Sequence, residues 1–70
     1  MSKFHVWIPE DYEFPSSADM LIFLTDMGIA FEASYNPGRY GTMFVFEAES
    51  LPILWAKQLY TDNLVTEVGL

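Results

Sequence analysis

The 70-residue chain contains no cysteine, one histidine, and only three basic residues against ten carboxylates. Without cysteine it can form neither disulfides nor thiolate metal sites, which fits a cytoplasmic protein. The basic residues, Lys3, Arg39 and Lys57, are too few to form a patch that follows a phosphate backbone. We therefore expect no direct binding to nucleic acid, and an anionic membrane surface would repel the chain for the same reason.

Long apolar stretches are also missing. The longest, Met20 to Leu24, is far shorter than the ~20 residues that a membrane-spanning helix needs. The N-terminal residues, MSKFHVWIPEDYE, include no apolar run long enough for a secretory signal. These absences predict a soluble, cytoplasmic protein.

Motifs for catalysis and for cofactors are absent too. One histidine without cysteine gives no nucleophile–base arrangement, and no Ser-His-Asp spacing is present. The turn-rich segment Asn36–Gly41, NPGRYG, follows a strand pattern but does not open a helix, so it is not a phosphate-binding loop. Adjacent carboxylates such as Glu10 and Asp11 lack the oxygen-ligand loop of a calcium site. We expect no enzymatic activity, no cofactor and no metal.

Large apolar side chains are plentiful. Hydrophobic residues form 51% of the chain and aromatic residues 17%, enough to build the core of one small domain over residues 1–70. The net charge of −7 would attract a basic protein, chiefly by speeding association. A second explanation remains open, in which the charge only keeps a small apolar domain soluble.

Local patterns predict six elements in the order β-α-β-β-α-β. Alternating apolar and polar residues indicate the strands, and Ser16 and Gly28 have the residue types of a helix N-cap and C-terminal stop. Ser50 is the expected cap of the second helix, with Pro52 in its first turn. The predicted strands are 3–8, 29–35, 42–48 and 64–68, and the predicted helices are 16–27 and 51–60.

This order predicts an α+β protein of the ferredoxin-like split βαβ type, with a four-stranded antiparallel sheet in the spatial order 4-1-3-2 and both helices on one face. Met20, Leu21, Leu24 and Met27 share one side of the first helix; Pro52, Trp55, Ala56 and Leu59 share one side of the second. The predicted core is Phe4, Val6, Leu21, Leu24, Phe31, Phe44, Phe46 and Leu59.

Three families with this topology are distinguished by residues that the chain lacks. RNA-recognition modules carry aromatic residues on the third strand, where this chain has Met43 and Val45. Acylphosphatases use an arginine-containing, anion-binding loop after the first strand, where this chain has the acidic PEDYEFPS. Heavy-metal-binding domains need CxxC. Topology alone does not assign a function.

The uncovered face of the predicted sheet is the candidate binding surface. His5 and Trp7 alternate with the core residues of the first strand, so they point away from the helices. Trp and Met are favoured in interface cores. The predicted partner-binding residues are His5 and Trp7, Met43 and Val45 beside them, Glu32, Glu47 and Glu67 (with Val65) at the rim, and Arg39 and Tyr40 at a hairpin tip.

These features predict a non-enzymatic protein-interaction module, a small acidic inhibitor or adaptor that occludes a basic surface on a partner protein. A small, acidic, cysteine-free chain of this kind resembles the host-takeover and anti-defence proteins of phages, including inhibitors of nucleic-acid-handling enzymes. The alternative is a small-ligand-binding or regulatory ferredoxin-like module of the ACT type, which forms a homodimer through the open sheet face.

Overall fold

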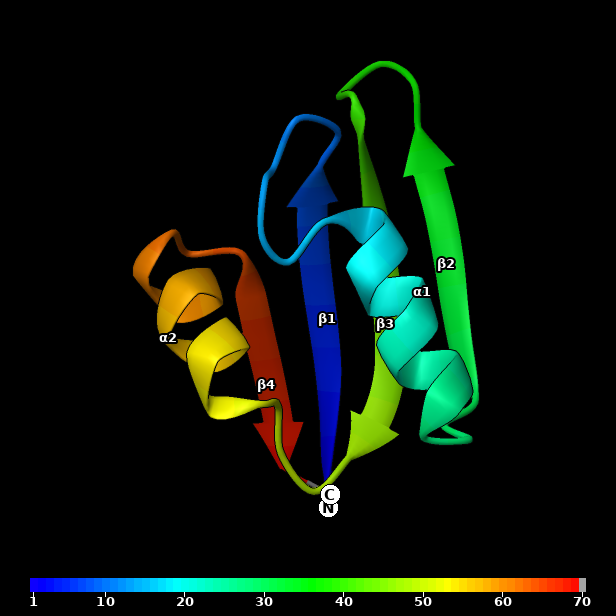
Figure 1. Cartoon of the computed structure of the whole chain (residues 1–70), viewed down its shortest axis with the longest axis vertical. Helices are drawn as coiled ribbons and strands as arrows, with labels where there is room; N and C mark the ends of the chain where they lie inside the picture. The colour runs from blue at the N-terminus through cyan, green and yellow to red at the C-terminus, as the bar shows by residue number, and fades with distance from the viewer. Residues whose placement is uncertain (70) are drawn as a thin grey trace.

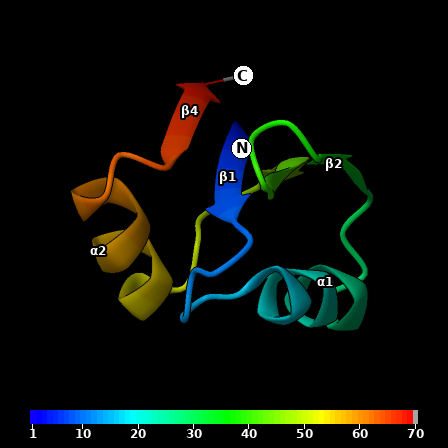
Figure 2. The same cartoon turned by 90° about the horizontal axis from the view of Figure 1, so that it is seen from above.

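The computed structural model describes residues 1–69 as a four-stranded antiparallel sheet with two helices (Figure 1). The strands lie in the order β2-β3-β1-β4, and Figure 2 shows both helices on the same face of the sheet, which is the ferredoxin-like α+β arrangement. The elements are β1 Ser2–Pro9, α1 Ser17–Asp26, β2 Phe31–Asn36, β3 Gly41–Ala48, α2 Ile53–Thr61 and β4 Val65–Gly69. The predicted element order, strand order and helix layer are confirmed, with bounds shifted by no more than two residues.

The core lies between the central strands and the helices. Phe4, Val6 and Ile8 alternate along β1 and are all buried, because every second side chain of a strand points to the same face. Phe4 pairs with Phe46 of β3, and their rings stack with centroids 5.5 Å apart. These buried side chains fix which face of β1 meets the helices, and so which face is left open.

The sequence signals that bound α1 operate as predicted. The backbone N–H of Asp19 donates to Ser16 Oγ at 3.2 Å, and the Ser16 N–H donates to Asp19 Oδ2 at 2.9 Å, which completes a capping box. Gly28, with φ 68°, follows the last turn. The next N–H, of Ile29, donates to the carbonyl of Leu24 at 2.9 Å and turns the chain toward β2.

Two predictions for the inward side of α1 are wrong. Leu21 and Met27 are exposed, whereas Met20 and Leu24 are fully buried. Met20 and Leu24 are four residues apart and so share one side of the helix, while Leu21 is rotated by about 100° from Met20. Met27 is the C-cap residue, beyond the last helical residue, and its side chain lies outside the core.

The predicted cap of α2 is also wrong. Pro52 is the N-cap, no side chain caps the helix, and Ser50 lies too far upstream to do so. Leu51, in the segment between β3 and α2, is buried in the core and anchors the start of the helix instead of a cap. The predicted core residue Phe31 is only half-buried, because β2 is an edge strand, although its ring still packs against the core.

Over residues 1–69, neither helix combines the length and the apolar character needed to cross a membrane.

Candidate protein-binding face

The face of the sheet that the helices leave uncovered carries a central cluster of four side chains. Trp7 lies directly opposite Met43, and His5 lies directly opposite Val45, across the pairing of β1 with β3. Paired residues point to the same face, and the intervening residues of both strands are buried on the helix side. The structure therefore places His5, Trp7, Met43 and Val45 together where the sequence predicts them. All four are half-buried, although no helix covers them.

The rest of this surface follows from the same register. We call it the open face, and it consists of Lys3, His5 and Trp7 of β1, Met43, Val45 and Glu47 of β3, Glu32 and Ser34 of β2, and Thr66 and Val68 of β4, with Arg39 above Trp7. Glu32 lies opposite Val45, and Glu47 lies opposite Lys3. Both carboxylates are thus at the β2–β3 side of the cluster, as predicted.

Trp7 is held from three directions. Its backbone N–H donates to the carbonyl of Leu64 at 2.8 Å, next to the start of β4. Its ring lies over Gly41, where an added Cβ would come within 2.8 Å of two ring atoms and still nearer to Cζ2. On the ring itself lies the guanidinium of Arg39, with Cζ 5.0 Å from the ring centroid. This cation–π contact and the glycine beneath the ring fix Trp7 in place on a central strand, near the end of β1.

Arg39 and Tyr40 both lie in the β2–β3 connection, but they are disposed differently. The sequence predicts that Arg39 projects from the tip. Instead, its guanidinium is folded back onto Trp7. Tyr40 has a φ of 54° and an exposed side chain, and its carbonyl accepts the N–H of Glu10 at 2.7 Å. The tip is therefore joined to the segment that follows β1.

The placement of Glu67 on the open face is wrong. It pairs with Phe4, and Val65 pairs with Val6, so both face the helix layer and Val65 belongs to the core. The Tyr60 hydroxyl donates to Glu67 Oε1 at 2.7 Å, which ties α2 to β4, and the Ser2 hydroxyl donates to Oε2 at 2.7 Å. These two hydrogen bonds lower the pKa of Glu67 below its ordinary value. Glu67 stabilises the fold and lies off the candidate surface.

Charge is distributed unevenly between the open face and the rest of the molecule. The open face has two basic residues, Lys3 and Arg39, and two carboxylates, so its formal charges balance. The other eight carboxylates lie elsewhere. We call four of them the acidic end: Glu10, Asp11 and Glu13 in the β1–α1 loop, and Asp62 at the end of α2.

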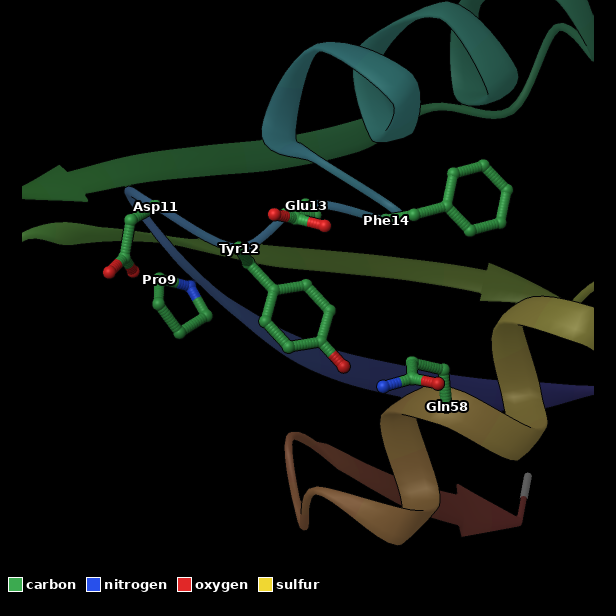
Figure 3. A pocket seen from close by; sticks show the side chains of 6 residues that line it. All are labelled: Pro9, Asp11, Tyr12, Glu13, Phe14 and Gln58. Atoms are coloured by element: carbon green, nitrogen blue, oxygen red, sulfur yellow. The ribbon is translucent and has the colours of Figure 1, made fainter.

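Asp11 and Glu13 of the acidic end line an open hollow of about 550 Å³ (Figure 3). It is lined by Pro9, Asp11, Tyr12, Glu13, Phe14 and Gln58. Figure 3 shows Tyr12 extending from the loop toward Gln58 on α2, and its hydroxyl donates to Asp62. Burial, followed by this hydrogen bond, raises the pKa of Tyr12. Apolar rings next to carboxylates make the hollow complementary to a basic side chain with an apolar stem.

Sequence reasoning missed an aromatic cluster between the two helices. The Trp55 ring packs edge-on against Phe23 of α1 and against Phe14 of the β1–α1 loop, with centroids 5.1 Å and 5.9 Å apart. Phe14 points into the space between α1 and α2 (Figure 3). Helical periodicity places Trp55 on the inward side of α2, but no local pattern shows that a loop phenylalanine reaches it.

Among the described residues, no group of three or more His, Asp and Glu side chains is arranged to hold a metal ion. Comparisons with protein-family models, with curated proteins and with solved structures find no match to this chain.

Proposed function

We propose that this chain is a non-enzymatic protein-interaction module, an acidic inhibitor or adaptor that occludes a basic surface on a partner protein. The observation that carries the proposal is the position of Trp7, which lies on a central strand of a face that neither helix covers. Tryptophan is over-represented among the residues that dominate binding energy, especially near the centre of an interface. Met43, Val45 and His5 surround it with half-buried surface that a partner would finish covering.

The acidic end supports the proposal that the partner presents a basic surface. It adjoins the Trp7 end of the open face, because Pro9 both pairs with Gly41 beside Trp7 and lines the hollow of Figure 3. A partner that contacts Trp7 and continues around Pro9 meets Glu10 and Asp11. Apolar contact at the tryptophan supplies affinity, and the carboxylates speed the encounter with a positively charged surface.

The partner class follows from this charge. Enzymes that handle nucleic acid bind phosphates through lysine and arginine and so present basic surfaces. An inhibitor that covers such a surface acts by occlusion and needs no chemistry of its own. We propose this role in the cytoplasm, as a phage-type anti-defence or host-takeover protein.

The test compares the proteins that the immobilised wild-type chain captures from a cell lysate with those that the immobilised Trp7→Ala variant captures. We expect a basic protein that the wild type retains, that rising salt releases, and that Trp7→Ala does not retain. Ile53→Ala, which truncates an exposed apolar residue of α2, is the matched control and should retain it. Equal capture by Trp7→Ala and wild type, with both variants folded, would refute the role of the open face.

The balance of charge on the open face favours a second candidate, a homodimeric regulatory module of the ACT type. Lys3 and Arg39 accompany Glu32 and Glu47 there, so two copies can pack face to face without net repulsion at the contact. Size-exclusion chromatography with light scattering distinguishes the candidates. A dimer that Trp7→Ala dissociates supports this second function, and a monomer at all concentrations supports the first.

A further inference from the structure

The helix layer carries another exposed apolar surface, on the opposite side of the sheet from the open face (Figure 2). Ile22 of α1 is 60% exposed and Leu54 of α2 is 73% exposed. Each directly precedes an aromatic residue of the cluster between the helices, Phe23 and Trp55, against which Phe14 also packs. We call Phe14, Ile22, Phe23, Leu54 and Trp55 the inter-helix surface.

Helix geometry separates this surface from the other exposed apolar residues. Successive residues of an α-helix are rotated by about 100°, and Trp55 faces α1. Leu54 therefore lies on the exposed side of α2 that adjoins Trp55, while Ile53, rotated by about 200° from Trp55, lies on the far side. The same relation holds on α1, where Ile22 adjoins Phe23 and Leu21 lies on the far side.

Negative charge predominates beside the inter-helix surface. Asp19 and Asp26 are each three or four residues from both Ile22 and Phe23, which places the two carboxylates between these apolar residues on α1. Asp62 ends α2 and accepts a hydrogen bond from Gln58 at 3.1 Å. Of the three basic residues, Lys3 and Arg39 are on the open face, and Lys57, three residues after Leu54, is the one that lies beside this surface, against three carboxylates.

We propose that the inter-helix surface binds a cationic amphipathic helix of a partner protein. The backbone groups of α1 and α2 are bonded within the helices, so this layer offers no strand edge to an incoming segment. A segment that packs here must pair its own backbone polar groups, which a helix does. Its apolar stripe covers Ile22, Leu54 and the aromatic rings, and its lysines or arginines reach the carboxylates.

A second copy of the chain fits this surface poorly. Each copy has a net charge of −7, and packing two helix layers together would bring the same carboxylates face to face. The inference goes beyond the proposed function, because the two surfaces lie on opposite sides of the sheet. A chain with both can hold two partners at once, as an adaptor does.

The experiment titrates the isotope-labelled chain with a designed amphipathic helical peptide whose polar face is lysine, and follows the backbone amides by NMR. We expect shifts confined to α1, α2 and the segment around Phe14. Ile22→Asn and Leu54→Asn should each weaken binding by about tenfold or more, as loss of a central apolar contact does. Leu21→Asn and Ile53→Asn change equally apolar, exposed residues of the same helices and should leave the affinity unchanged.

Three results would overturn the inference. One is an equal affinity for the far-side and the inter-helix variants, whether lowered or unchanged, which would mean that binding does not depend on this surface. Another is equally tight binding of a peptide whose lysines are replaced by glutamates. The third is self-association of the chain that Ile22→Asn abolishes, which would make a second copy the occupant. Trp7→Ala should leave peptide binding unchanged, so failure here is separate from failure of the open face.

Discussion

Replacing Gly41 by alanine tests how Trp7 is held on the open face. Gly41 is buried, and the ring of Trp7 occupies the space that a Cβ would need. The nearest atoms belong to the indole ring, which cannot yield by a small torsion of a flexible end. Because φ at Gly41 lies outside the left-handed region, alanine fits the backbone, and the effect comes from the ring alone.

The expected change in the free energy of unfolding combines one stabilising and two destabilising contributions. Replacing glycine by alanine at a compatible site usually stabilises by about 0.4–1 kcal/mol, since it restricts the unfolded chain. Overpacking, by contrast, costs about 1–3 kcal/mol. Displacing Trp7 also separates it from Arg39, and an exposed cation–π contact contributes about 0.5–1 kcal/mol. We expect Gly41→Ala to lower the free energy of unfolding by about 1–3 kcal/mol.

Equilibrium urea denaturation of a double-mutant cycle measures this effect. In the Trp7→Ala background no ring opposes the new methyl group, so Gly41→Ala should be neutral or stabilising by up to about 1 kcal/mol. The sign of the effect therefore reverses between the two backgrounds. An equal loss in both, or no loss in the wild-type background, would refute the packing of Trp7 on Gly41.

The remaining predictions concern the core, a helix cap and a carboxylate. Phe44→Ala empties a fully buried site and should cost about 3–5 kcal/mol in chemical denaturation; a loss below about 1 kcal/mol would contradict the register of β3. Ser16→Ala should cost about 1 kcal/mol, whereas Ser50→Ala, which removes no cap, should change stability by less than about 0.5 kcal/mol. NMR titration should find the pKa of Glu67 below its ordinary value, and Tyr60→Phe should raise it by removing a donor. Because the folded-state pKa is the lower one, the stability that Glu67 contributes is present above the unfolded-state pKa and is lost as pH falls through the folded value.

Much of the fold follows from the sequence because its signals agree with one another. The alternation in β1 contrasts Phe4, Val6 and Ile8 with His5 and Trp7, so only one assignment buries the three residues without a polar group. With β1 and β3 both central, the positions of Met43 and Val45 follow by pairing. The location of this cluster was therefore predictable, while its role in binding stays a prediction.

The last strand shows where such reasoning fails. In β4 the residues facing one way include Thr66 and Val68, and those facing the other way include Val65 and Glu67, so each face has one aliphatic and one polar residue. Alternation alone cannot choose between them. Tertiary contacts determine which face is buried. Val65 pairs with the buried Val6, and Glu67 lies on an edge strand, where it accepts a hydrogen bond from Tyr60.

Two contacts of functional interest were beyond any local pattern. Arg39 reaches Trp7 only because the hairpin folds over the end of β1, and Phe14 reaches Trp55 only because a loop crosses between the helices. Both are contacts between side chains far apart in the sequence. Strand pairing and helical periodicity specify elements and faces, but not where a long side chain settles after those elements have packed.

The strand order also dictates the sequence of events by which the sheet assembles. β1 is the most N-terminal strand, yet its neighbours in the finished sheet are β3 and β4. The β2–β3 hairpin closes over a short connection and can form within microseconds, whereas β1 pairs across long loops whose closure slows folding. Before β3 has been synthesised β1 has no partner on either edge, and its second edge stays unpaired until β4 follows. The native pairing of β1 is therefore complete only after β4 has been translated.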